Sequence, residues 1–267
     1  MSTPGELGMY DPAFVAEHAP WLRRGLFRYF RADVSGLEHL PEGPFVAVGN
    51  HSGATLIPDT LVWLAEYHTA GRSTPLLTLA HDQLFTAYPA PLSRALARLG
   101  AVRACPSLAR RALDAGYAVQ LYPGGDYDAC RSYARRDEIV FAGRRGYVDL
   151  AREAGVPLVP IVSHGAHAAL LVLWDGAALA DALDLPRRLR LATFPLSLSL
   201  PWGLWLGPLP GYWPLPTRIT VRALPPVSPE GPPDEVDARV RDAMQAELTR
   251  LALRARRERR GRPESAP

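Results

Sequence analysis

The chain of 267 residues contains no lysine, and all thirty of its basic residues are arginine. This absence excludes chemistry that needs a lysine, such as a Schiff base or a P-loop phosphate site. Cysteine is scarce too, because Cys105 and Cys130 are the only two, and we expect free thiols rather than a disulfide scaffold. The first thirty residues lack the continuous apolar run of a secretory signal, which favours the cytosolic side.

An excess of charge of one sign is also missing. The formal net charge is +3, too small to indicate a nucleic-acid partner. Hydrophobic residues make up 48% of the chain and charged residues 21%, which is typical of a globular protein and excludes wholesale disorder. The length suits one main domain with a sizeable core.

Short apolar runs alternate with helical patterns from residue 44 onward. Strands are predicted at residues 45–48, 76–80, 118–122, 158–162 and 218–222. Helices are predicted at residues 59–70, 82–99 with a break at proline, 106–115 and 144–154. This alternation predicts an α/β fold with a mostly parallel sheet flanked by helices, whose ligand sites lie at the carboxyl ends of the strands.

Accessory helices are predicted at both ends of the chain. Residues 21–31 place aromatic and aliphatic side chains on one side and arginines on the other, so this helix either lies at an anionic membrane or packs on its own domain. Residues 233–260 form a second helix with an apolar stripe and a basic end. We therefore divide the chain into a membrane-proximal helix (1–35), a main domain (36–225) and a C-terminal helix with a basic tail (226–267).

Residues 191–217 carry no charge and are long enough to span a bilayer. The segment also contains six prolines, which remove backbone donors and break helices, so a spanning helix is not expected. We predict an apolar loop that dips into the membrane interface, lines an acyl-chain groove or packs against the core.

A histidine follows the first predicted strand, in the sequence Asn50-His51-Ser52-Gly53. Its imidazole can remove a proton from a hydroxyl if a carboxylate fixes its tautomer. Asp59 is the nearest acid downstream, but on a continuous helix it would lie ~12 Å from His51, so the loop must fold back. Asp82 and Asp126 are the alternatives.

Other polar residues follow the later strands. Tyr122-Pro123-Gly124-Gly125-Asp126 is either a plain turn or a nest of backbone amides for an anion, and Arg131 lies just beyond. Ser163, His164 and His167 follow the next strand. The clustering of such residues at strand ends predicts a site there.

Three further motifs are Pro58-Asp59, Arg144-Arg145-Gly146-Tyr147 and Gly155-Val156-Pro157. Together with the residues quoted above, they resemble the glycerolipid acyltransferase superfamily in order and spacing over about residues 36–225. The segments Pro123-Gly124-Gly125 and Arg144-Arg145-Gly146-Tyr147 look like its diacylglycerol acyltransferase branch. Two positions depart from the common pattern: Leu56 stands where the family has its aspartate, and Gly124 stands where it has a glutamate.

The resemblance implies an O-acyltransferase that moves a fatty acyl group from acyl-CoA or acyl carrier protein to a hydroxyl of a lysophospholipid or other glycerolipid. It implies direct attack without an acyl-enzyme, with His51 as general base, Asp59 as its partner, and no cofactor beyond the thioester co-substrate. The implied place is the cytoplasmic face of a membrane, with the protein peripheral or monotopic and membrane lipids as partners. The substrate-binding residues implied are Asn50, Ser52, Gly53, Arg103, Tyr122, Pro123, Gly124, Gly125, Asp126 and Arg131.

Three other interpretations stay open. A serine hydrolase would use Ser52 or Ser163 as nucleophile, although the chain has no G-x-S-x-G motif. A zinc site would use His164, His167 and Cys130. A lipid-binding scaffold without catalysis would explain Leu56 at the position of the family's aspartate.

Overall fold

A computed structural model describes residues 4–54, 56–86, 88–189, 191–209 and 211–261. Within them the strands are β1 (Asp33–Ser35), β2 (Val46–Gly49), β3 (Leu76–Ala80), β4 (Ala101–Arg103), β5 (Ala118–Leu121), β6 (Leu158–His164), β7 (Leu171–Trp174), β8 (Leu196–Ser199), β9 (Gly203–Leu206) and β10 (Thr220–Ala223). The helices are α1 (Pro12–Phe30), α2 (Pro58–Thr69), α3 (Gln83–Thr86), α4 (Ala90–Arg98), α5 (Pro106–Asp114), α6 (Asp126–Ala129), α7 (Gly146–Ala154), α8 (Ala177–Ala182), α9 (Leu185–Leu189) and α10 (Pro233–Arg259).

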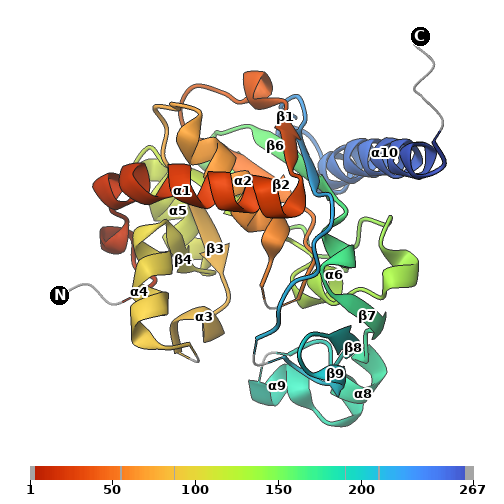
Figure 1. Cartoon of the computed structure of the whole chain (residues 1–267). Coiled ribbons are helices and arrows are strands. Elements are labelled where there is room, and N and C mark those ends of the chain that lie inside the picture. Colours follow the sequence, from red (N-terminus) through yellow and green to blue (C-terminus); the bar gives the residue numbers. More distant parts are fainter. Residues whose placement is uncertain (1–3, 55, 87, 190, 210, 262–267) are drawn as a thin grey trace.

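The main sheet has the strand order β1-β10-β6-β2-β5-β3-β4 in the described part of the chain. From β6 to β4 all neighbouring strands are parallel, whereas β10 runs antiparallel to β6 and parallel to β1. The predicted α/β fold with a mostly parallel sheet is thus confirmed. The carboxyl ends of β2, β5 and β6 lie side by side, which brings together the loops that follow them (Figure 1).

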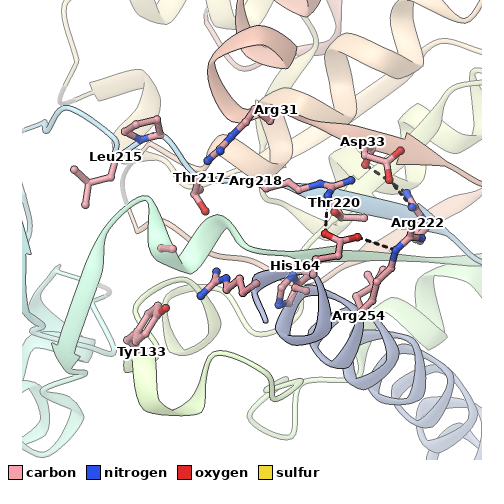
Figure 2. Close-up of a pocket in the computed structure, with 16 residues that line it drawn as sticks. Arg31, Asp33, Tyr133, His164, Leu215, Thr217, Arg218, Thr220, Arg222 and Arg254 are labelled. Carbon is pink, nitrogen blue, oxygen red and sulfur yellow. Dashed lines mark hydrogen bonds and ion pairs between the residues drawn. The ribbon is translucent and has the colours of Figure 1, made fainter. Parts of the chain in front are cut away.

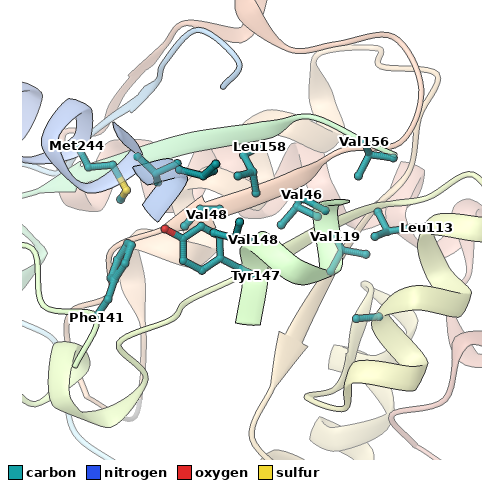
Figure 3. Close-up of a cluster of buried hydrophobic side chains, with 14 of the residues drawn as sticks. Val46, Val48, Leu113, Val119, Phe141, Tyr147, Val148, Val156, Leu158 and Met244 are labelled. Atoms are coloured by element: carbon teal, nitrogen blue, oxygen red, sulfur yellow. The ribbon is translucent and has the colours of Figure 1, made fainter. Parts of the chain in front are cut away.

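Helices cover both faces of the main sheet. On one face Val46, Val48 and Leu158 pack with side chains of α5, α7 and α10, including Met244 (Figure 3). On the other face Phe45 and Ala47 pack with α1 and α2, where Trp63 and Tyr67 are fully buried. β2 is therefore buried on both sides, which explains why its sequence is a continuous apolar run.

α1 begins nine residues before the predicted helix, where Asp11 caps it by accepting a hydrogen bond from the backbone of Phe14 at 3.1 Å. Its buried side chains pack against α2, as one of the two interpretations expected. Trp21 and Leu22, predicted to share the apolar side, are exposed. The ends of the predicted terminal segments, residues 1–3 and 262–267, lie outside the described residues.

The uncharged segment at residues 191–217 is only partly the loop predicted from its prolines. It contributes β8 and β9 to a second sheet of order β7-β8-β9, which lies apart from the main sheet near α8 and α9 (Figure 1). None of the helices described is both long enough and apolar enough to cross a bilayer.

Candidate active site

His51 lies just beyond the carboxyl end of β2, in contact with Tyr122 from the end of β5. Gly49, the last residue of β2, leaves room for this contact, because a Cβ atom there would lie 2.5 Å from Cε1 of Tyr122. The phenol ring stacks on the imidazole, with ring centroids 4.2 Å apart and planes inclined by 21°. The hydroxyl of Thr60 donates a hydrogen bond to the Tyr122 hydroxyl at 2.7 Å and fixes that ring.

Asp59 is the acid that faces His51. Its Oδ1 lies 3.8 Å from Nδ1 of the imidazole. Ser52 donates its hydroxyl proton to Oδ2 at 2.9 Å, and the backbone of Thr60 donates to Oδ1 at 2.8 Å. The carboxylate is buried, and Nδ1 of His51 is buried without a hydrogen-bond partner among the described residues. Nε2 is therefore the ring nitrogen left to meet a substrate.

The loop between the two residues folds back, as their spacing requires. Gly53, Ala54 and Ile57 have φ values of 88°, 48° and 35°, which turn the chain before α2 begins at Pro58. Leu56, at the position of the family's aspartate, packs instead with an apolar cluster formed by residues around β7 and Tyr212. The acid thus stands at position 59, three residues later than in the family's pattern, and the folded-back loop still brings it to face His51.

A buried network that we did not predict holds the backbone of His51. Asp128 accepts hydrogen bonds from the amide of His51 and from Nη1 of Arg131, and Nη2 of Arg131 contacts Nε2 of His167 at 2.7 Å. Burial lowers the pKa of Arg131 to about 10, and burial with this nearby charge holds the pKa of His167 well below its usual range. His167 is therefore neutral and accepts the bond. The sequence signal for this network was the spacing of Asp128 and Arg131, three positions apart just after Gly124-Gly125.

Several predicted substrate-binding residues have structural partners instead. Arg131 is 1% exposed in the network just described, out of reach of a bound lipid. The amide of Asn50 donates to the carbonyl of Ser163 at 2.9 Å and accepts from its amide at 2.8 Å, which joins the ends of β2 and β6. Both residues position the His51 loop.

The turn Pro123–Gly125 is tightly packed. A Cβ atom on Gly124 would lie 2.1 Å from the carbonyl oxygen of Val140, which explains why a glutamate does not fit there. Gly125 donates its amide to the carbonyl of Tyr122 at 3.1 Å, as in a plain turn, and Arg144 donates to the carbonyl of Gly124 at 3.3 Å. The Gly125 amide, one member of the predicted anion nest, thus already donates its hydrogen bond within the turn.

The other acids and Arg103 lie elsewhere. Asp126 accepts a hydrogen bond from the backbone of Ala192 at 2.7 Å, and Asp82 pairs with Arg103 at 3.4 Å. Arg103 ends β4, which β5 and β3 separate from β2, so it lies ~14 Å across the sheet from His51. Of the three acids considered, Asp59 is the one that forms an ion pair with this histidine in the described structure.

The described residues give little support to the zinc and hydrolase interpretations. They contain no group of three histidine, cysteine or acidic side chains placed to hold a metal ion. His164 lies 3.6 Å from Asp137, and His167 contacts Arg131. The hydroxyl of Ser52 points to Asp59 rather than to His51, and that of Ser163 is buried without a partner among the described residues.

A basic cavity of about 570 Å³ opens beside His164, one strand away from the His51 loop. Its wall includes Arg31, Arg218, Arg222, Arg254 and Arg259 against two carboxylates, Asp33 and Glu258 (Figure 2). Asp33 pairs with Arg222 at 2.6 Å and Glu258 with Arg218 at 2.7 Å. Burial lowers the pKa of His164, which adds no charge at neutral pH. The arginines therefore outnumber the acids, and the cavity attracts anions.

A family model described as "Acyltransferase" matches residues 31–164, half of the chain, and includes the strands that hold His51, Tyr122 and His164. The chain belongs to the acyltransferase family. This confirms the resemblance to the glycerolipid acyltransferase superfamily that the sequence blocks carry.

Relatives occur in mycobacteria and are uncharacterized, and one solved structure shares the fold. An uncharacterized protein of Mycobacterium tuberculosis, Rv0502, is 30% identical over 206 residues, which are 76% of this chain and 56% of that protein. A protein of Mycobacterium leprae, ML2427, is 31% identical over 213 residues, with shares of 79% and 56%. The chain thus spans little more than half the length of these relatives. The crystal structure of the 1-acyl-sn-glycerophosphate acyltransferase PlsC from Thermotoga maritima has the same fold, with a TM-score of 0.55 and 17% identity over 89% of this chain and 79% of that chain.

Proposed function

We propose that this acyltransferase moves a fatty acyl group from an acyl thioester, acyl-CoA or acyl carrier protein, to a hydroxyl of a lysophospholipid or another glycerolipid. The observation that carries the proposal is the pair of His51 and buried Asp59 at the carboxyl end of β2, with Nδ1 facing the acid and Nε2 left for a substrate. Tyr122 holds the imidazole plane by stacking, and Asp128 holds its backbone.

In this mechanism neutral His51 is the general base. Nε2 accepts the proton of the acceptor hydroxyl while that oxygen attacks the thioester carbonyl carbon. Asp59 stabilises the imidazolium that forms, because its negative charge faces Nδ1. The tetrahedral intermediate then collapses: the C–S bond breaks, the ester remains, and the imidazolium returns the proton to the departing thiolate. Ser52 serves by orienting Asp59 and forms no acyl-enzyme.

The basic cavity supports an anionic substrate. Coenzyme A carries phosphates, and so do lysophospholipids, so either would gain from the excess of arginine over acidic side chains beside His164. We propose that the phosphate-bearing part of one substrate lies there. Nothing in the composition suggests nucleic acid as that anion, because the net charge of +3 is small.

An acyl-transfer assay tests the function. Purified protein receives labelled long-chain acyl-CoA or acyl carrier protein with lysophospholipids, lysophosphatidic acid, monoacylglycerol or diacylglycerol as acceptors, beside His51→Ala. We expect product with wild type and a loss of about 10²- to 10⁴-fold in the variant, the usual contribution of a general base. Undiminished transfer by His51→Ala, or binding of acyl-CoA without transfer to any acceptor, contradicts the proposal. The second result favours a lipid-binding scaffold.

A further inference from the structure

β8, the central strand of the small sheet β7-β8-β9, has its polarity reversed. Along β8 the serines point inward, with Ser197 0% and Ser199 7% exposed, whereas Leu198 between them is 45% exposed. Neither serine hydroxyl has a hydrogen-bond partner among the described residues. A sheet with one face in water normally turns its apolar side chains inward and its polar side chains outward. Strands that face lipid show the opposite arrangement.

The outward side chains form a continuous apolar surface. Residues paired across antiparallel strands point to the same side, and Leu198 pairs with Leu204 while Leu196 pairs with Leu206. Leu204 is 63% exposed and Leu206 50%. We call these four leucines the leucine face. Exposed apolar patches of this kind mark interaction sites.

The surroundings of the leucine face suit a bilayer. Exposed tryptophans, Trp174, Trp202 and Trp213, lie on or beside the same small sheet, and tryptophan is enriched at the membrane interface. Residues 191–217 contribute no charge, whereas Arg187 and Arg188 on neighbouring α9 have side chains that are 87% and 73% exposed and share one carboxylate, that of Asp184, at 3.8 and 3.7 Å, which leaves an excess of positive charge there. Arginines beside an apolar patch attract anionic lipid headgroups.

The inward face of the small sheet is joined to the catalytic loop. Val172 of β7 and Tyr212 pack with Ala54 and Leu56, which lie in the loop between His51 and α2. Tyr212 also donates a hydrogen bond to the carbonyl of Gly53 at 2.5 Å. The small sheet would therefore lie between a lipid surface on the leucine face and the loop that carries His51.

We propose that the leucine face is the membrane-docking surface of this protein and that it inserts into the boundary between headgroups and acyl chains of an anionic bilayer. The occupant is lipid because aromatic and basic side chains flank the four leucines. α1 packs its buried side on α2 and exposes Trp21 and Leu22, so these two residues are the alternative membrane contact that the experiment must distinguish from the leucine face. The further statement that this docking delivers an acceptor lipid to His51 rests on the proposed function.

Vesicle sedimentation tests the docking without any substrate turnover. The full chain is mixed with vesicles of phosphatidylcholine and phosphatidylglycerol, and Leu198→Gln/Leu204→Gln is compared with Trp21→Gln/Leu22→Gln on α1, a matched pair of exposed apolar residues. We expect the first variant to lose at least about tenfold in apparent affinity and the second to stay within about twofold of wild type. Thermal unfolding of both variants verifies that they fold.

Quenching by brominated phosphatidylcholine gives a second readout. We expect Trp174→Phe/Trp202→Phe/Trp213→Phe to lose most of the lipid-dependent quenching and Trp21→Phe to keep it. Loss of binding in the α1 variant alone would overturn the proposal. A second combined result would also overturn it: wild type does not bind vesicles and is a dimer in light scattering, whereas the leucine variant is a monomer. In that case a second copy of the chain covers the leucine face. Intact vesicle binding without acyl transfer refutes the proposed function only, and transfer to soluble short-chain acceptors without vesicle binding refutes the docking only.

Discussion

Replacing Asp59 by asparagine removes the negative charge that faces His51 and keeps the shape of the side chain. The amide can still accept the bond from the backbone of Thr60, so the loop is expected to hold its conformation. At an effective dielectric constant of about 20, opposite unit charges separated by the observed 3.8 Å interact by about 4 kcal/mol. The imidazolium that forms in the transition state loses this stabilisation, which corresponds to about 10³-fold in rate.

We therefore expect Asp59→Asn to lower kcat for acyl transfer by about 10²- to 10³-fold and to change KM much less. The matched control is Asp126→Asn, the same chemical change at an acid whose partner is the backbone of Ala192. It should retain kcat within about threefold. Initial rates at saturating thioester and acceptor measure both variants. If Asp59→Asn keeps a third or more of wild-type kcat, or if Asp126→Asn is the variant that loses activity, the assignment of the acid is refuted.

Two further predictions concern stability. Gly49→Ala places a Cβ atom 2.5 Å from the Tyr122 ring and should lower the free energy of unfolding, measured in denaturant titrations, by about 1–3 kcal/mol. The control variant Gly25→Ala has open space around the new methyl group on α1 and should not lower it. Equal stability of the two variants would refute the packing argument. Burial lowers the pKa of His68 to about 4, below its value near 6.5 in the unfolded chain. The contribution of this neutral imidazole to the free energy of unfolding is therefore present above pH 6.5 and is lost as the pH falls toward 4. When the pH is lowered from 7 to 4.5, the free energy of unfolding of His68→Leu should fall by about 2.5 kcal/mol less than that of wild type. The same dependence of stability on pH in both proteins would show that His68 does not take up a proton on unfolding.

The main sheet could be predicted because its central strands are continuous apolar runs. β3 was placed at its observed bounds, and β2 and β5 within one residue, because strands buried on both faces leave a plain signal in the sequence. β1 and β4 were missed because strands of three residues are too short to show periodicity. The antiparallel direction of β10 depends on long-range packing and has no local signature.

The small sheet was missed for a different physical reason. Leucines and serines alternate in β8 with the period of a strand, but prolines crowd the same segment, and they favoured a loop. At the site, the sequence suggested His51 and left three acids as candidates, because the fold-back of the loop at Ala54 and Ile57 lies in backbone angles that side-chain types do not reveal. The network of Asp128, Arg131 and His167 depends on contacts between β5, β6 and their loops.

The central claim is direct acyl transfer with His51 as base, and the most direct measurement counts both products of one reaction. Free thiol and new ester are quantified together for wild type, His51→Ala and His81→Ala, the last a control histidine just beyond β3. The account predicts one thiol released per ester formed in wild type and in His81→Ala, with both lost together in His51→Ala. Thiol released without ester, or ester formed at the wild-type rate by His51→Ala, would contradict it.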